Sequence, residues 1–95
     1  MGDTARYRRR EGVVQRTIAG ETILVPVRGG IADVMNLYVL NPTALALWEL
    51  LETPRTLEEL AEHLTRSTDG EAGEVQRDCR EFLQRMEELG LVESL

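Results

Sequence analysis

The sequence predicts an α+β fold in which a three-stranded antiparallel sheet is followed by three helices. Two observations predict it. The first forty residues contain short runs rich in β-branched residues, separated by glycine-containing turns. From residue 42 onward, apolar residues recur at spacings of three and four, as amphipathic helices require. Because a sheet of this kind has an apolar face to bury, the helices are expected to cover it, in an outline similar to a winged helix-turn-helix.

The sheet is expected to form from three successive strands. Val13–Ile18 and Thr22–Val25 have the composition of strands, and Ala19–Glu21 between them is typical of a turn. Gly29-Gly30 allows a second reversal of the chain. A third strand is predicted over Val34–Leu40, which completes an antiparallel meander.

The first two helices begin with recognisable capping residues. Asn41 is a good N-cap, and Pro42 falls at the first helical position, where its missing N–H costs nothing. This helix is expected to end at Glu52, before a Thr-Pro pair. Thr56 and Glu59 form a capping box at the start of the second helix.

The third helix is predicted from near Glu71 to Gly90, a residue type that favours helix C-termini. Val75, Cys79 and Phe82 follow the 3-4 spacing of a core-facing stripe. The core is therefore expected to hold Phe82 together with Trp48 of the first helix.

Length and charge place limits on the function. The 95 residues predict one domain, with a flexible basic N-terminal arm over residues 1–12 and a folded part over residues 13–95. The formal net charge is −6, and the negative charge is concentrated after the arm. Phosphate binding needs clustered positive charge, so a nucleic-acid-binding surface is not expected.

The composition also disfavours catalysis. A single Cys79 and a single His63 exclude a cysteine-based metal site made by one chain, so neither a metal nor another cofactor is expected. No run of apolar residues approaches the length of a membrane helix, and the N-terminal arginines precede no apolar stretch typical of a secretory signal. A cytoplasmic, non-enzymatic protein is the expectation.

One strand is a candidate binding element. Val34–Leu40 is almost wholly apolar and contains none of the Lys, Glu or Pro residues that usually protect an edge strand from pairing. Three interpretations follow from this observation: the helices cover both faces of the strand, a second copy of the chain pairs with it, or a peptide adds to it as a further strand.

The chain resembles the PqqD family. The resemblance rests on three segments: Tyr38-Val39-Leu40-Asn41-Pro42-Thr43-Ala44 followed by Leu47-Trp48-Glu49-Leu50-Leu51, then Pro54-Arg55-Thr56-Leu57-Glu58-Glu59-Leu60-Ala61, and finally Phe82-Leu83 with Leu89-Gly90-Leu91-Val92. Members of this family are RiPP recognition elements. These are domains that bind the leader region of a ribosomally made precursor peptide and deliver the peptide to a modifying enzyme, often a radical S-adenosylmethionine enzyme.

The resemblance implies where a peptide would bind. The leader would add as a strand beside the third strand, in a cleft that the third helix lines. The residues implied are Met35, Asn36, Leu37, Tyr38 and Val39 of the strand and Arg80, Leu83, Gln84 and Met86 of the helix. A winged-helix DNA-binding module is the alternative function, although acidic residues stand at the start of the third helix, where phosphates would be met. A homodimerisation module is a further alternative, and it is compatible with peptide binding.

Overall fold

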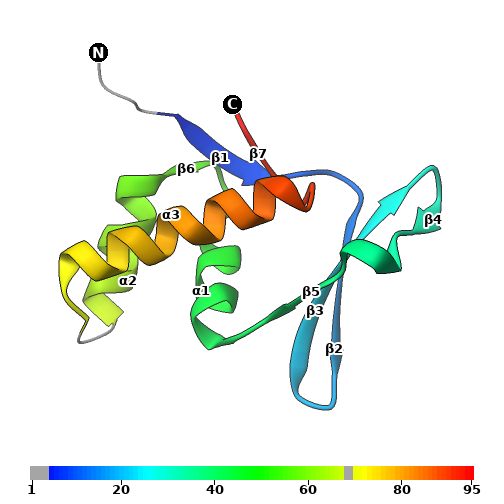
Figure 1. Ribbon diagram of the computed structural model, residues 1–95, viewed down its shortest axis with the longest axis horizontal. Coiled ribbons are helices and arrows are strands. Elements are labelled where there is room, and N and C mark those ends of the chain that lie inside the picture. The colour runs from blue at the N-terminus through cyan, green and yellow to red at the C-terminus, as the bar shows by residue number, and fades with distance from the viewer. Residues whose placement is uncertain (1–4, 68–69) are drawn as a thin grey trace.

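The computed structural model describes residues 5–67 and 70–95, which adopt the predicted α+β fold. The three helices lie on one side of the molecule, and the hairpin of β2 and β3 extends away from them on the other (Figure 1). In chain order the elements are β1 (Arg6–Arg9), β2 (Val13–Ile18), β3 (Glu21–Arg28), β4 (Ile31–Ala32), the 3₁₀ helix η1 (Val34–Asn36), β5 (Tyr38–Leu40), α1 (Pro42–Leu50), β6 (Arg55–Thr56), α2 (Leu57–Ser67), α3 (Ala72–Glu88) and β7 (Val92–Ser94).

The predicted hairpin of the first two strands is confirmed. β2 has the predicted bounds, and it pairs antiparallel with β3 from Val13 opposite Pro26 to Ile18 opposite Glu21. The two residues of the turn, Ala19 and Gly20, have φ angles of 54° and 82°. Positive φ at both positions defines the type I′ turn, whose twist matches that of a two-stranded hairpin.

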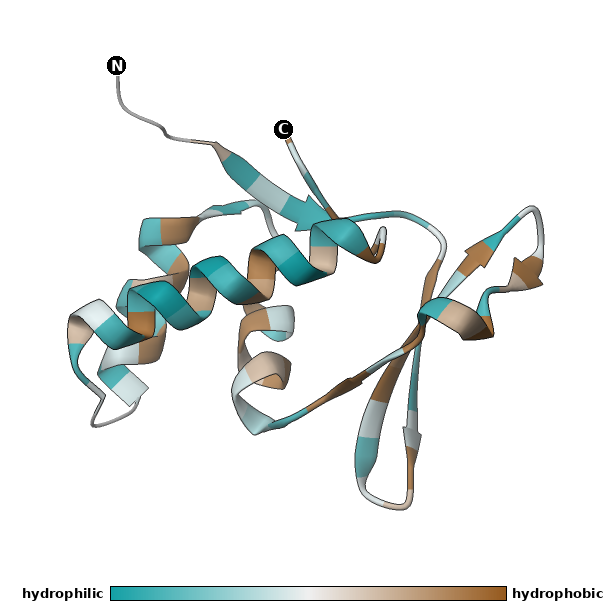
Figure 2. Ribbon diagram, in the orientation of Figure 1, coloured by the Kyte–Doolittle hydropathy of each residue, from teal (hydrophilic) through white to brown (hydrophobic). Residues whose placement is uncertain are grey.

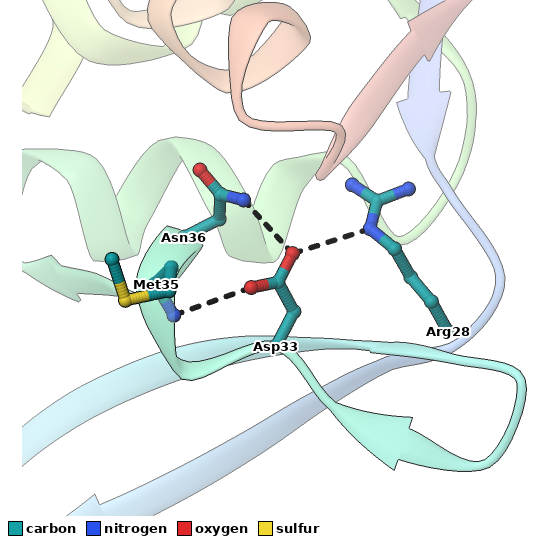
Figure 3. A network of polar contacts seen from close by, with 4 residues as sticks. All are labelled: Arg28, Asp33, Met35 and Asn36. Carbon is teal, nitrogen blue, oxygen red and sulfur yellow. Dashed lines mark hydrogen bonds and ion pairs between the residues drawn. The ribbon is translucent and has the colours of Figure 1, made fainter.

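The predicted third strand is shorter than expected. Only Tyr38–Leu40 forms a strand, β5, which pairs antiparallel with β3. Residues 34–36 form η1 instead, because the Asp33 side chain accepts hydrogen bonds from the Met35 N–H at 3.2 Å and from Asn36 Nδ2 at 2.8 Å (Figure 3). An aspartate that bonds the backbone two residues ahead favours a turn over an extended strand.

Arg28 completes this group of contacts. Its Nε lies 3.4 Å from Asp33 Oδ2 (Figure 3). The hydrogen bond from Asn36, assisted by those from Met35 and Arg28, lowers the pKa of the Asp33 carboxyl below its usual range. The negatively charged form of Asp33 therefore stabilises the turn that connects β4 to β5.

A second sheet was not expected from the sequence. β1 pairs with β6 on one side and β7 on the other, so that Arg6 lies opposite Thr56 and Arg9 lies opposite Val92. The predicted flexible arm over residues 1–12 is therefore corrected, since its residues 6–9 form the central strand of this sheet. Residues 1–4 of the arm lie outside the described residues.

The predicted starts of the first two helices are confirmed. Asn41 Oδ1 accepts from the Ala44 N–H at 2.8 Å, with Pro42 at the first helical position. Thr56 and Glu59 make both bonds of the capping box, at 2.9 Å and 3.1 Å. The end of α1 differs slightly from the prediction, because the helix stops at Leu50.

The core lies between the helices and the inner face of the β2–β3–β5 sheet. Trp48 and Phe82 are 2% and 8% exposed, as predicted, and Leu24 of β3 is completely buried with them. The indole N–H of Trp48 donates to Gln15 Oε1 at 3.1 Å, which ties α1 to β2. The same group of buried side chains packs α1, α2 and α3 against the sheet and positions α1 and α3 around β5.

Candidate peptide-binding cleft

A cleft of about 420 Å³ lies where β5, α1 and α3 meet. Tyr38 at the start of β5 and the first turns of α1 form one side of it, and one face of α3 forms the other. The residues that line it are Tyr38, Asn41, Thr43, Ala44, Leu47, Asp78, Glu81, Phe82 and Arg85. Three of these side chains, Ala44, Leu47 and Phe82, belong to the core, so the bottom of the cleft is apolar while its rim is polar.

β5 borders this cleft as an edge strand. One of its sides pairs with β3, and within residues 5–67 and 70–95 no strand pairs with its other side. Successive side chains of a strand alternate between its faces. Tyr38 accordingly packs toward the core and lines the cleft, whereas Val39 is 45% exposed. A strand with a free side next to a cleft is a suitable place for an extended chain to pair.

The segment that leads into β5 is unusually apolar for a surface. Figure 2 shows hydrophobic residues on β4, η1 and β5, along the segment that leads into α1. Their exposed fractions are 73% for Ile31, 63% for Val34, 88% for Met35, 42% for Leu37 and 45% for Val39. Contiguous exposed apolar side chains of this kind mark interaction surfaces more often than scattered ones do.

The sequence-predicted strand residues divide into two groups. Leu37 has extended backbone angles and precedes Tyr38 and Val39 at the free edge. Met35 and Asn36 lie in η1, and their N–H groups already donate to the side chain and the backbone oxygen of Asp33. These two amides are therefore not available for pairing with a peptide while η1 is formed.

The sequence-predicted helix residues lie elsewhere. Arg80, Leu83 and Gln84 line a separate depression of about 320 Å³, together with Tyr7, Leu57 and Glu87. Met86 is completely buried. The structure does not bring these four residues together with the β5 edge.

The α3 residues at the cleft have a regular spacing. Asp78, Glu81 and Arg85 are three and four residues apart, which places them on one face of the helix. All three are exposed. The helical periodicity was visible in the sequence, but it could not indicate which flank of the apolar stripe faces β5.

Groups that could support catalysis are few. Cys79 is completely buried, and burial, with a contribution from the nearby Asp78 carboxylate, raises the pKa of its thiol to about 11. His63 Nε2 lies 3.4 Å from Arg55 Nη1, on α2 and away from the cleft. Among the described residues, no group of three His, Cys, Asp or Glu side chains is placed to hold a metal ion. No helix in this part of the chain has the length and apolarity needed to cross a membrane.

Two comparisons relate this geometry to known proteins. The model of a protein family described as "Coenzyme PQQ synthesis protein D (PqqD)" matches residues 21–92, which is most of the chain. The solved structure described as "TbiB1 in Complex with the TbiA(beta) Leader Peptide" is similar, with 24% sequence identity and a TM-score of 0.74. The similarity covers 90% of this chain and 94% of that one. No protein of curated function matches the chain significantly. From the extent of the family match, we conclude that this chain belongs to the PqqD family.

Proposed function

We propose that this protein binds the leader region of a precursor peptide in the β5–α3 cleft and presents that peptide to a modifying enzyme, without catalysing a reaction itself. The observation that carries the proposal is the free edge of β5 beside a cleft with an apolar bottom. Membership of the PqqD family and a similar fold that was solved with a leader peptide support it.

The proposed binding mode is strand addition. An extended peptide would pair antiparallel with the free side of β5, over Leu37–Leu40. Main-chain hydrogen bonds would supply affinity, and alternate side chains of the peptide would enter the cleft and supply specificity. Because η1 already uses the amides of Met35 and Asn36, pairing would begin at Leu37.

The helix contacts in this proposal differ from those expected from the sequence. Asp78, Glu81, Phe82 and Arg85 line the cleft beside β5, so they are the proposed contacts. The flank that carries Arg80 and Gln84 borders the other depression, and it would be free for a different contact.

The partners are proposed at the level that family membership supports. The second partner would be a peptide-modifying enzyme, with the radical S-adenosylmethionine class as one candidate beyond what the family match supports, and both proteins would act in the cytoplasm. A homodimer through the β5 edge would compete with peptide binding, because both would use the same side of the strand. The DNA-binding alternative is disfavoured by Glu71 at the N-cap of α3 and by Glu74 and Asp78 on its first half, which would repel phosphates.

A pair of bulky substitutions tests the proposal. Thr43 and Gln84 are both exposed helical residues, and each lines a different depression beside α3. Thr43→Tyr would fill the β5–α3 cleft, and Gln84→Tyr would fill the other. The ligand is the fluorescently labelled leader segment of the precursor peptide encoded nearest to this protein's gene, and binding is followed by anisotropy.

The two variants have different expected outcomes. Thr43→Tyr should weaken binding by at least about tenfold, the equivalent of about 1.4 kcal/mol. Gln84→Tyr should leave binding close to that of the unmodified protein. The reverse result would move the site to the flank with Arg80 and Gln84, and circular dichroism would confirm that both variants are folded.

A further inference from the structure

The β5–α3 cleft contains two carboxylates without a counter-ion. Asp78 and Glu81 are exposed, and among the described residues neither takes part in an ion pair. They are three residues apart on α3, which places their side chains next to each other at the rim of the cleft. The rim of the cleft on this side is therefore negatively charged.

The other charged and polar groups of the cleft do not balance this charge. Arg85 supplies one positive charge to the cleft, against the two negative charges of Asp78 and Glu81, and its Nη1 also lies 3.9 Å from the exposed Glu88 carboxylate. The N-terminus of α1 also faces the cleft, but Pro42 has no N–H and the Ala44 N–H is bonded to Asn41. Among the first three residues of α1, only Thr43 therefore has a backbone N–H group that is free to bind an anion. The N-terminus of this helix is a poor anion-binding site for that reason.

The spacing of charge and apolar surface along α3 matches that of an extended peptide. Asp78 and Phe82 are four residues apart, which corresponds to about 6 Å along the helix axis. Alternate residues of an extended peptide are about 6.6 Å apart and point to the same side. A peptide that runs along α3 beside β5 would thus place one side chain at Asp78 and the next same-side residue at Phe82, and a long Lys or Arg side chain at Asp78 would also reach toward Glu81 on the same helix face.

We infer that the peptide bound in this cleft carries a Lys or Arg two residues from an apolar residue, and that Asp78 and Glu81 bind the basic group. This inference rests on the proposed function, because it assumes a peptide paired with β5. It adds the chemical class of the ligand: a leader segment with a basic–x–apolar pattern, read in either direction. The apolar member would contact Phe82 and Tyr38 at the bottom of the cleft.

Selection from a displayed library of random peptides tests this pattern directly, whatever the sequence of the natural leader. Peptides of about 14 residues are long enough to extend beyond β5 on both sides. The library would be selected in parallel on the unmodified protein and on the double variant Asp78→Asn/Glu81→Gln. Enrichment of Lys or Arg two positions from an apolar residue is expected on the unmodified protein, and loss of that enrichment is expected on the variant.

A second double variant separates the effect of charge at the cleft from the effect of the overall charge of the protein. Glu58→Gln/Glu62→Gln also removes two negative charges, but these residues lie on α2 beside a different pocket. Enriched peptides should bind the cleft variant about two- to thirtyfold more weakly, because two exposed ion pairs contribute roughly 0.2–1 kcal/mol each. Screening by salt over about 8 Å should leave the α2 variant close to the unmodified protein.

The outcomes distinguish the two proposals. The selected peptides would also be tested for protection of the β5 amides from hydrogen exchange. If they protect β5 but show no preference for Lys or Arg, or if they bind both double variants equally, the inference is overturned and the proposed function stands. A library from which no peptide protects β5 would overturn both.

Discussion

The guanidinium of Arg9 lies 4.5 Å from the centroid of the Trp48 ring, and its Nη2 donates to the Trp48 carbonyl oxygen at 2.6 Å. This contact joins β1, in a segment that the sequence suggested would be flexible, to the central aromatic residue of α1. Burial lowers the pKa of Arg9, and the carboxylates of Glu52 and Glu49 oppose that shift. The second sheet is therefore connected to the core through a half-buried cation.

This contact predicts that Arg9→Ala destabilises the fold much more than Arg8→Ala does. Arg9 combines a cation–π contact with hydrogen bonds to a carbonyl, which together contribute about 1–3 kcal/mol. Arg8 makes an exposed ion pair with Glu93, a type of contact worth about 0–1 kcal/mol. Urea unfolding of both variants measures the difference. Equal, small losses would show that β1 contributes little to stability.

Trp48→Ala should reduce the free energy of unfolding by about 3–5 kcal/mol, the usual range for a large aromatic residue removed from a core. Trp48 is 2% exposed, and the variant also loses the bond to Gln15 and the contact with Arg9. Chemical denaturation followed by circular dichroism gives the value. A loss below about 1 kcal/mol would contradict the central position of Trp48.

Alanine substitution should change the stability of the fold in opposite directions at two glycines, Gly73 within α3 and Gly90 just after its C-terminus. Gly90 has a φ of 75°, a conformation that costs other residues about 1–2 kcal/mol, so Gly90→Ala should destabilise by about that amount. The end of the flexible Arg28 side chain, whose Nη2 is 2.5 Å from the position of a Cβ, would move aside. Gly73 lies in α3 with no atom within 4 Å of the position of a Cβ. Gly73→Ala should therefore stabilise by up to about 1 kcal/mol. Thermal unfolding of the two variants measures both effects, and a stabilising Gly90→Ala would refute the assigned C-terminal turn.

The buried thiol predicts a loss of stability at high pH. The pKa of Cys79 is about 11 in the folded protein, against an ordinary value of 9.0. Between these values the folded state retains a proton that the unfolded state loses, so stability falls as pH rises, by up to about 1.4 kcal/mol per pH unit. The free energy of unfolding should therefore fall more steeply from pH 9 to 11 than it does for Cys79→Ala. Parallel profiles for the two proteins would contradict the assigned burial.

The elements with local signals were predictable from the sequence. β2 has the predicted bounds because β-branched residues and a two-residue turn specify it locally. Asn41 and the Thr56–Glu59 box fixed the starts of α1 and α2 through side-chain bonds within four residues. The stripe of α3 also predicted the burial of Phe82.

The second sheet was not predictable in the same way. β1 contains one apolar residue, Tyr7, among three arginines, so neither alternation nor hydrophobicity indicated a strand. Its partners, β6 and β7, are about 50 and 85 residues away in the sequence, and each is only two or three residues long. Such pairing depends on how the helices bring distant segments together, which no local pattern records.

The candidate site was predicted in part. The apolar segment before Asn41 indicated an edge, and β5 is one. Asp33 shortened that edge, because its side chain holds Met35 and Asn36 in a turn. The face of α3 beside β5 depends on the rotation of the helix about its buried stripe. Leu83 and Phe82 are both buried, so the stripe alone did not show which flank borders the cleft.

Amide hydrogen exchange of the protein with and without the bound leader segment tests strand addition to β5 most directly. The account predicts increased protection of amides within Leu37–Leu40, with the amides of β2 unchanged because that strand lies on the opposite edge of the sheet. The amides of Met35 and Asn36 should change little, since they are already bonded within the turn. Protection confined to β2, or no change at either edge despite saturating peptide, would contradict the account.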